Sequence, residues 1–398
     1  MWRSVASNFL TILIVALVVG VGLIAWGQRE YVGPGPLDRS VCVRVDQGQR
    51  FRPLADELAS DGVISSARIF RIGAEYSEKS DDLKAGSFLV PEAASMETVL
   101  DLVTRGGAST CGTEVVLRVG VAAQEIEVRE LDPETERFEE VAAFDPAETE
   151  APANYTSVRG EPDTRYRVAL AEGVTSWRVV EALKAADFLA GEVADVPEEG
   201  RLAPDSDEVT DGSERGALLA EMGRRQDQRL AEAWANRVEG LPVTTPEEAL
   251  ILASIIEKET GIAEERPTVA SVFVNRLNQG MRLQTDPTVI YGVTEGRGVL
   301  GRGLRQSELR AETPWNTYVI DGLPETPIAN PGIESLQAAV DPAETDYLFF
   351  VADGTGGHVF AETLDEHNAN VAEWRAIEAE RAQTAEDGAA EDGAAEGQ

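Results

Sequence analysis

The sequence has 398 residues, of which 43% are hydrophobic and 27% charged, so it is long enough to bury two or three cores. Its 71 acidic residues against 35 basic ones give a formal net charge of -36, and the average field would repel phosphate backbones and anionic lipid surfaces. We therefore expect no nucleic-acid partner and more than one small module.

An apolar run at residues 9–26 contains no charged residue and is long enough to cross a hydrocarbon core of roughly 30 Å as a helix. Arg3 precedes the run, and Arg29 and Glu30 follow it, which favours a cytoplasmic N-terminus at residues 1–8 by the positive-inside rule. A cleaved signal peptide and a buried core helix are the alternatives, although no small-x-small cleavage site follows Trp26.

A small α+β domain is predicted at residues 41–110, after a Gly/Pro linker at 27–40. It begins with a strand at 41–45 and a helix at 52–60, on which Leu54 and Leu58 share a face. A short helix follows from Ser65 or Ser66, then a strand at 85–91. Ser95 caps a last helix that ends at Gly106.

The only two cysteines, Cys42 and Cys111, bracket this domain. In an oxidising compartment they could form a disulfide, and two unpaired buried thiols are equally open. Neither lies in a CxxC motif or beside a histidine, so the sequence predicts no zinc site at them.

Residues 111–164 are expected to hold a connecting strand, near 114–119, and an acidic insertion. The stretch 132–163 is rich in Glu, Pro and Ala with little periodicity and is predicted as a loop. A strand at 166–171 and a helix at 176–188 follow. The acidic low-complexity tail, residues 376–398, is predicted to be disordered.

The most informative helix begins after Thr245, a good N-cap that is followed by Pro246 and by Glu248 of a capping box, and it should run toward Gly261. At about 100° per residue, Glu257 shares the apolar side of this helix, whereas Glu259 points about 160° away toward solvent. Apolar surroundings disfavour a charged carboxyl and should raise its pKa toward that of a proton donor. A buried ion pair of Glu257 with Arg266 or Arg276 is the structural alternative.

A second helix at 267–279 ends at Gly280 and is followed by a polar, loop-like stretch at 281–292. Amide, hydroxyl, carboxylate and aromatic groups gather there, as a sugar site needs for hydrogen bonding and stacking. Such groups also serve as backbone caps in turns. The candidate substrate-binding residues are Asn275, Gln284, Thr285, Asp286, Tyr291, Asn316 and Tyr318.

Other features point to structural roles. His358 and His367 lack further ligands at metal-binding spacings, so we predict no metal site at these histidines. The sequence GTGG at 354–357 is predicted as a hairpin turn and not as a phosphate loop.

Four stretches closely resemble the endolytic murein transglycosylase, or YceG-like, family: LASIIEKETG (252–261), VASVFVNRLNQGMRLQTDPTVIYG (269–292), PWNTYVIDGLPETPIANPG (314–332) and DYLFFVADGTGGHVFAETLDEHN (346–368). The resemblance implies an α+β catalytic domain at 165–375 and a LysM-like, glycan-contacting subdomain at 41–110. It also places the catalytic residue on Glu257. EGRLAPDSD (199–207) is similar to the family's EG-x-L-x-PDTY segment, but Asp207 stands where tyrosine is usual, which weakens a ligand role for this loop.

The implied mechanism uses one carboxyl twice, first as an acid toward the glycosidic oxygen between N-acetylmuramic acid and N-acetylglucosamine, then as a base toward the muramic 6-hydroxyl. The product is a 1,6-anhydro end, and no cofactor is implied. The resemblance implies peptidoglycan strands as substrate, peptidoglycan synthases as possible partners, and a single-pass protein of the cell inner membrane with a periplasmic body. A non-catalytic glycan-binding scaffold and a hydrolytic muramidase, with Asp286 as second carboxyl, are the alternatives.

Overall fold

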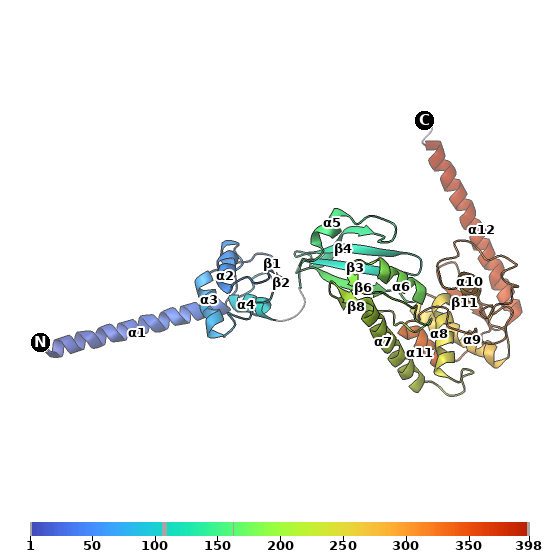
Figure 1. The fold of residues 1–398 in the computed structure, drawn as a ribbon, viewed down its shortest axis with the longest axis horizontal. Helices are drawn as coiled ribbons and strands as arrows, with labels where there is room; N and C mark the ends of the chain where they lie inside the picture. The colour runs from blue at the N-terminus through green and yellow to red at the C-terminus, as the bar shows by residue number, and fades with distance from the viewer. Residues whose placement is uncertain (1, 106–109, 162, 396–398) are drawn as a thin grey trace. The chain divides into compact units, whose positions relative to one another are not determined.

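The computed structural model describes residues 2–105, 110–161 and 163–395 (Figure 1). The chain divides into two compact units: unit 1 comprises Met1–Val116, Ile126–Arg167 and Glu208–Asp211, and unit 2 comprises Leu117–Glu125, Val168–Asp207 and Gly212–Gln398. Helices and strands are interspersed in both, which confirms the predicted α+β class. The predicted helix stop at Gly106 and the end of the tail, 396–398, lie outside the described residues.

Helix α1 (Trp2–Val32) contains the predicted membrane segment and extends beyond it. Its residues Thr11–Val32 have a mean hydropathy of 2.2, and none of this segment is buried within the protein. The helix is therefore long and apolar enough to cross a membrane, a property that a signal sequence shares. The lack of burial excludes the core-helix alternative. The predicted linker is shorter than expected, because the helix continues to Val32 and ends just before Gly33 and Pro34.

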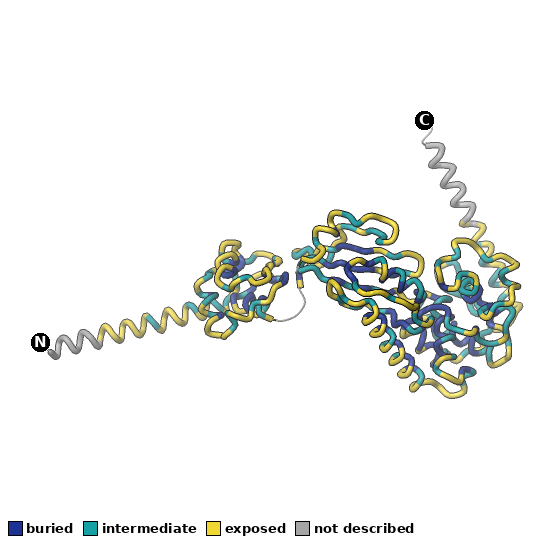
Figure 2. The backbone as a smooth tube through the Cα atoms, in the orientation of Figure 1, coloured by how far each residue is buried: buried dark blue, intermediate teal, exposed yellow. Residues whose placement is uncertain are grey.

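Unit 1 contains a βααβ subdomain, which we define as β1 (Val41–Val45), α2 (Phe51–Ser60), α3 (Ala67–Tyr76) and β2 (Gly86–Val90), followed by α4 (Met96–Thr104). Strands β1 and β2 pair antiparallel. The hydroxyls of Ser66 and Ser95 cap α3 and α4, so the expected helix starts are confirmed. The apolar faces meet in one core, dark in Figure 2, whose members include Leu54, Leu58, Phe70, Val90, Val99 and Leu100.

A disulfide joins Cys42 of β1 to Cys111, with the two Cα atoms 5.8 Å apart. It ties the βααβ subdomain to the residues just before β3. Of the two alternatives that the sequence leaves open, the structure contains the bonded one.

A five-stranded sheet has the order β5-β4-β3-β6-β8. Its strands are β3 (Thr113–Val119), β4 (Gln124–Asp132), β5 (Arg137–Phe144), β6 (Arg165–Leu170) and β8 (Ser206–Val209). The prediction of a loop at 132–163 is wrong, because this stretch forms β5 and helix α5 (Ala153–Val158). β5 is the edge strand of the sheet, next to β4, and none of its residues is buried. It can therefore carry Glu on both faces, and its sequence lacks the alternation of apolar and polar residues that would predict a strand. Phe144 anchors it against the buried Tyr155.

Unit 2 is mainly helical. Its elements are α6 (Ser176–Ala185), β7 (Leu189–Ala190), β9 (Ser213–Glu214), α7 (Arg215–Ala235), α8 (Pro246–Glu259), the 3-10 helix η1 (Ala263–Glu265), α9 (Arg266–Asn278), α10 (Asp286–Thr294) and α11 (Ile333–Val340). The short strands β7 and β9 pair in parallel. Helix α8 lies among α7, α9 and α11, and its apolar residues Leu252, Ala253 and Ile256 are at most 2% exposed in the shared core.

The C-terminal part holds the hairpin β10 (Phe349–Ala352) and β11 (His358–Ala361), then helix α12 (Leu364–Ala395). The backbone N–H of Asp353 donates to the carbonyl of Gly357, which confirms the predicted hairpin turn. The backbone of α12 continues through residues 376–395 of the stretch that is predicted to be disordered. Ala and Glu, which make up much of this stretch, are both strong helix formers.

Candidate active site

Glu257 lies in the last turn of α8, which the sequence positions from its first turn onward. Thr245 accepts a 3.1 Å hydrogen bond from the Glu248 N–H, and Glu248 accepts one from the Thr244 N–H. Thr245 is therefore the N-cap, as expected. The return bond of the capping box is shifted, because Glu248 accepts it from the N–H of Thr244, one residue before the N-cap. The buried side of the helix then carries the Glu257 side chain inward, where only 5% of it is exposed.

Within the described part of the chain, the Glu257 carboxyl has one backbone donor and one cationic neighbour. The backbone N–H of Gly332 donates a 2.9 Å hydrogen bond to Oε2, and Arg266 Nη2 lies 3.7 Å from Oε1. The same guanidinium is closer to two other carboxylates, with 2.5 Å from Nη1 to Glu334 Oε2 and 3.3 Å from Nη2 to Glu172 Oε2. The structural alternative is therefore present in part, as an arginine shared among three carboxylates with Glu257 the most distant.

The groups around Glu257 perturb one another electrostatically. Burial, and then the negative charge of Glu257, raise the pKa of Glu172. Burial lowers the pKa of Lys258, against the opposing effects of Glu257 and Glu199. Lys258 Nζ donates a 3.3 Å hydrogen bond to the carbonyl of Gly173. The carboxyls of Glu257, Glu172, Glu199 and Glu334 thus lie near two of the described cations, Arg266 and Lys258.

Glu199 brings one predicted substrate residue, Tyr291, toward this site. Its carboxyl accepts hydrogen bonds from the Ser176 N–H at 2.8 Å and from the Tyr291 hydroxyl at 3.2 Å. Burial raises the pKa of Glu199 above its usual range, and burial together with Glu199 raises that of Tyr291. The Tyr291 ring packs edge-on against Trp315 at 5.5 Å, so an aromatic wall stands beside Glu199.

The prediction that Glu259 faces solvent is wrong. Its carboxyl accepts a hydrogen bond from the Thr285 hydroxyl, and burial raises its pKa. The Tyr318 hydroxyl donates a 2.6 Å hydrogen bond to Asp286 nearby, and we name Glu259, Thr285, Asp286 and Tyr318 the Glu259 cluster. The stretch 281–292, which is predicted to be loop-like, contains most of helix α10. Leu283, just before α10, is fully buried, and its burial holds the start of α10 next to the end of α8. Three of the predicted substrate residues therefore gather around Glu259.

The remaining candidates lie elsewhere. The Asn275 amide donates to the carbonyls of Thr345 and Tyr347, and the fully buried Asn316 amide donates to three carbonyls between residues 308 and 311. Both amides thus fasten backbone segments. Gln284 is exposed and adopts a left-handed backbone conformation, with φ of 50°.

Sequence reasoning missed the carboxyl neighbours of Glu257. Glu172 and Glu334 lie 94 and 68 residues from Arg266 in the chain, beyond the reach of helical periodicity. The local signal was glycine: a Cβ on Gly332 would lie 1.7 Å from Glu172 Oε1, so glycine leaves room for the Glu172 carboxyl in this position. At Gly173 an added Cβ would be in ordinary contact with Glu257 Cγ, so the φ of +77°, and not a lack of space, favours glycine there.

His358 and His367 make contacts within the fold: His358 Nδ1 lies 2.8 Å from Glu265 Oε2, and the His367 ring is stacked on Phe349. Among the described residues, no three His, Cys, Asp or Glu side chains are grouped to hold a metal ion.

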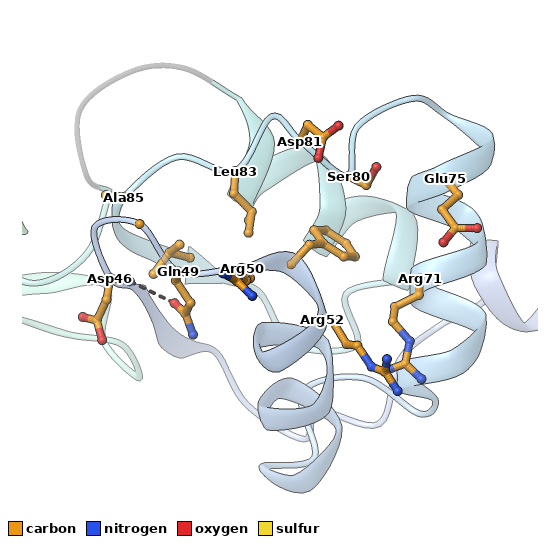
Figure 3. A pocket seen from close by; sticks show the side chains of 13 residues that line it. Asp46, Gln49, Arg50, Arg52, Arg71, Glu75, Ser80, Asp81, Leu83 and Ala85 are labelled. Carbon is orange, nitrogen blue, oxygen red and sulfur yellow. Dashed lines mark hydrogen bonds between the residues drawn. The ribbon is translucent and has the colours of Figure 1, made fainter.

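A second candidate site lies in the βααβ subdomain. A cavity of about 630 Å³ opens between α2, α3 and the residues that precede β2 (Figure 3). Its lining is mostly charged and polar, with Arg50, Arg52, Arg71, Asp46, Glu75 and Asp81 around Leu83. Such a lining suits a hydroxylated ligand more than an apolar one.

Comparisons with known proteins identify relatives of the same family that the four sequence stretches resemble. An endolytic murein transglycosylase of Bacillus subtilis is 44% identical over 119 residues, which are 30% of this chain and 32% of that protein. One from Streptococcus pneumoniae is 27% identical over 340 residues, 84% of this chain and 58% of that protein. These matches span less than two thirds of either relative. The crystal structure of a YceG-like protein from Listeria monocytogenes aligns with 83% of this chain and 98% of its own, at 24% identity and a TM-score of 0.44.

The profile of the YceG-like family covers nearly the whole chain beyond α1. It matches residues 43–373, from β1 into α12, and so includes both the βααβ subdomain and the surroundings of Glu257. The protein therefore belongs to the YceG-like family.

Proposed function

We propose that this protein cuts peptidoglycan glycan strands as a lytic endotransglycosylase, with Glu257 as its single acid/base catalyst. The observation that carries the proposal is the position of Glu257. Within a YceG-like chain, it is one of two enclosed carboxyls in the last turn of α8, and the Gly332 backbone N–H fixes one of its oxygens, whereas Glu259 is bonded to the Thr285 hydroxyl. The relatives' names, endolytic murein transglycosylase, support the choice of reaction and substrate.

The reaction balances with one carboxyl and no water. Protonated Glu257 gives its proton to the glycosidic oxygen, and the bond from muramic C1 to that oxygen breaks. The muramic O6 attacks C1, and its hydroxyl proton passes to the carboxylate of Glu257. The products are a new N-acetylglucosamine 4-hydroxyl and a 1,6-anhydro end, with Glu257 protonated again.

The neighbours of Glu257 suit these two proton transfers. The Gly332 N–H holds Oε2 at 2.9 Å, which leaves Oε1 to exchange the proton. When Glu257 has given up its proton, Arg266 stands 3.7 Å away and balances part of the new charge. Because Glu334 and Glu172 lie closer to Arg266, the guanidinium does not form an exclusive ion pair with Glu257.

We propose that the strand approaches over the outer side of Arg266. Glu334 and Glu172 are 54% and 41% exposed there, whereas Arg266 is only 7% exposed. Tyr291, beside Glu199, is the proposed sugar contact nearest the catalyst. Gln284 and the Asp286–Tyr318 pair are proposed contacts for further sugar units, and Thr285, Asn275 and Asn316 position these segments.

We also propose where the enzyme works. Helix α1 would anchor it in the cell inner membrane with a cytoplasmic N-terminus and a periplasmic body, since Arg3 precedes the apolar segment. The cavity of the βααβ subdomain would contact glycan in the manner of a LysM-like module. An enzyme held there can limit strand length near the synthases that release new strands.

Mass spectrometry of the ends produced from purified glycan strands tests the function. A lytic transglycosylase yields 1,6-anhydro-muramic ends, and a muramidase yields reducing ends that are heavier by one water. Anhydro ends support the proposal. Reducing ends alone, or strand binding with no cleavage, would replace it with the muramidase or the scaffold.

A further inference from the structure

Helix α3 of the βααβ subdomain leaves an unusual side uncovered. Its inner side is buried through Phe70 and Ala74. Its outer side carries Arg68, Ile72 and Tyr76 at a spacing of four residues, so the three lie in one stripe. Ile72 is 57% exposed and Tyr76 is 92% exposed. We name these three residues the α3 stripe.

The end of α1 is fastened to the same helix. The Tyr31 ring lies so close to Gly73 that a Cβ on Gly73 would be 2.2 Å from a ring carbon. Ser65, just before α3, donates a 2.8 Å hydrogen bond to Glu30. The Gly35 N–H then bonds to the carbonyl of Ala93. No free linker therefore separates α1 from the subdomain, and Figure 1 shows α3 at the side where α1 enters.

The rise of α1 sets the height of α3 above a membrane. Trp26 ends the uncharged apolar run, and Tyr31 lies five residues later, or about 7.5 Å along a helix. The polar layer on each side of the hydrocarbon core is roughly 5 to 7.5 Å thick, so Tyr31 lies at the outer edge of this layer. An apolar segment that ended at Val32 would place the charged Arg29 and Glu30 in hydrocarbon, so we take Trp26 as its end. Gly73, which packs on Tyr31, is therefore level with the outer part of the lipid headgroups.

We propose that the α3 stripe lies in the headgroup layer of the leaflet from which the C-terminal end of α1 emerges, so that the βααβ subdomain contacts the membrane surface. This inference rests on the proposed anchoring by α1. The residue types fit the layer, because tyrosine is enriched at membrane interfaces and the Arg68 guanidinium can bind phosphate. The occupant is a zwitterionic phospholipid surface, since the net charge of -36 disfavours a strongly anionic one.

Site-directed spin labelling tests this on the full chain. Both native cysteines are in the disulfide, so a single added cysteine can be labelled specifically. The protein is reconstituted in phosphatidylcholine nanodiscs with a nitroxide at Ile72→Cys or Tyr76→Cys. Gln47→Cys, an exposed position after β1, is the matched control, and Val18→Cys reports on α1. Collisions with oxygen, which enters lipid, are compared with collisions with a water-soluble nickel chelate.

The expected result is a several-fold higher ratio of oxygen to nickel collisions at positions 72 and 76 than at 47. A lipid-exposed label at 18 with water-exposed labels at 72 and 76 overturns the inference and leaves the anchor intact. Labels at 72 and 76 shielded from both reagents indicate a protein partner and also overturn it. A water-exposed label at 18 overturns the anchor, and the inference with it.

Discussion

Arg266 Nη2 lies 3.7 Å from Glu257 Oε1, beyond hydrogen-bonding distance, although both side chains are more than nine-tenths enclosed. The guanidinium is instead 2.5 Å from Glu334, which is half exposed. When two buried charges pair only with each other, removal of one partner lowers the free energy of unfolding by about 3–5 kcal/mol, because the other charge is left unpaired. Here Arg266 keeps Glu334 and Glu172 when Glu257 is neutralised. Stability and activity should therefore respond differently to substitution of Glu257.

Gly332→Ala should reduce glycan cleavage without unfolding the protein. The added Cβ would overlap Glu172 Oε1, and the flexible Glu172 side chain can swing outward to relieve the overlap. That movement takes Glu172 from Arg266 and disturbs the N–H that bonds Glu257. Cleavage rate and unfolding temperature are measured together. Gly261→Ala is the control, since a Cβ there meets nothing within 4 Å, and equal activity of the two variants would contradict the arrangement.

Asn316→Ala should destabilise the fold by about 2–3 kcal/mol, because several carbonyls lose a buried donor. Chemical denaturation measures this. Cleavage per folded molecule should stay near that of the wild type, as expected of a residue that positions the backbone. Tyr318→Phe, which removes one partly exposed hydroxyl bond, is the comparison and should cost less. A stable Asn316→Ala protein with weakened strand binding would show that Asn316 binds sugar.

Glu259→Gln should stabilise the protein at pH 8 and change it least at pH 4. Burial raises the pKa of Glu259, so the folded state holds this proton more tightly than the unfolded state does. That contribution is present below the ordinary glutamate pKa of about 4.3 and is lost as the pH rises through the raised pKa. Glutamine carries no charge and can still accept the Thr285 bond. Parallel pH profiles for the wild type and the variant, with exposed Glu264→Gln as the control, would contradict this.

Replacing both cysteines by serine should lower the stability of the βααβ subdomain by about 4 kcal/mol in the chain-entropy model, since the bond closes a loop with a sequence separation of 69. Thiol counting on denatured, exported protein should find no free thiol. Two free thiols in that protein would show that the bond does not form.

The features predicted correctly are those that neighbouring residues determine. Thr245 caps α8, Ser95 caps α4, and Leu54 and Leu58 are buried as the helical spacing indicates. The apolar side of α8 likewise places Glu257 inward. These are local consequences of helix geometry, so the sequence suffices for them.

The errors at the candidate site share a physical cause, which is contact between segments that are distant in the chain. The helical angles predict that Glu259 faces solvent, because they contain no information on Thr285, which packs against the end of α8. Arg266 could be named as a partner of Glu257, but its sharing with Glu334 and Glu172 depends on segments far along the chain. The edge strand β5 is missed for another reason: none of its residues is buried, so its sequence shows no alternation of apolar and polar residues.

The role of Glu257 as the acid/base catalyst is tested by product analysis of Glu257→Gln beside Glu334→Gln. Glu334→Gln neutralises the closest partner of Arg266, whereas Glu257→Gln neutralises the proposed catalyst. We expect Glu257→Gln to fold, bind strands and form no 1,6-anhydro ends, and Glu334→Gln to form them still. Anhydro ends released by Glu257→Gln at the wild-type rate would contradict this role.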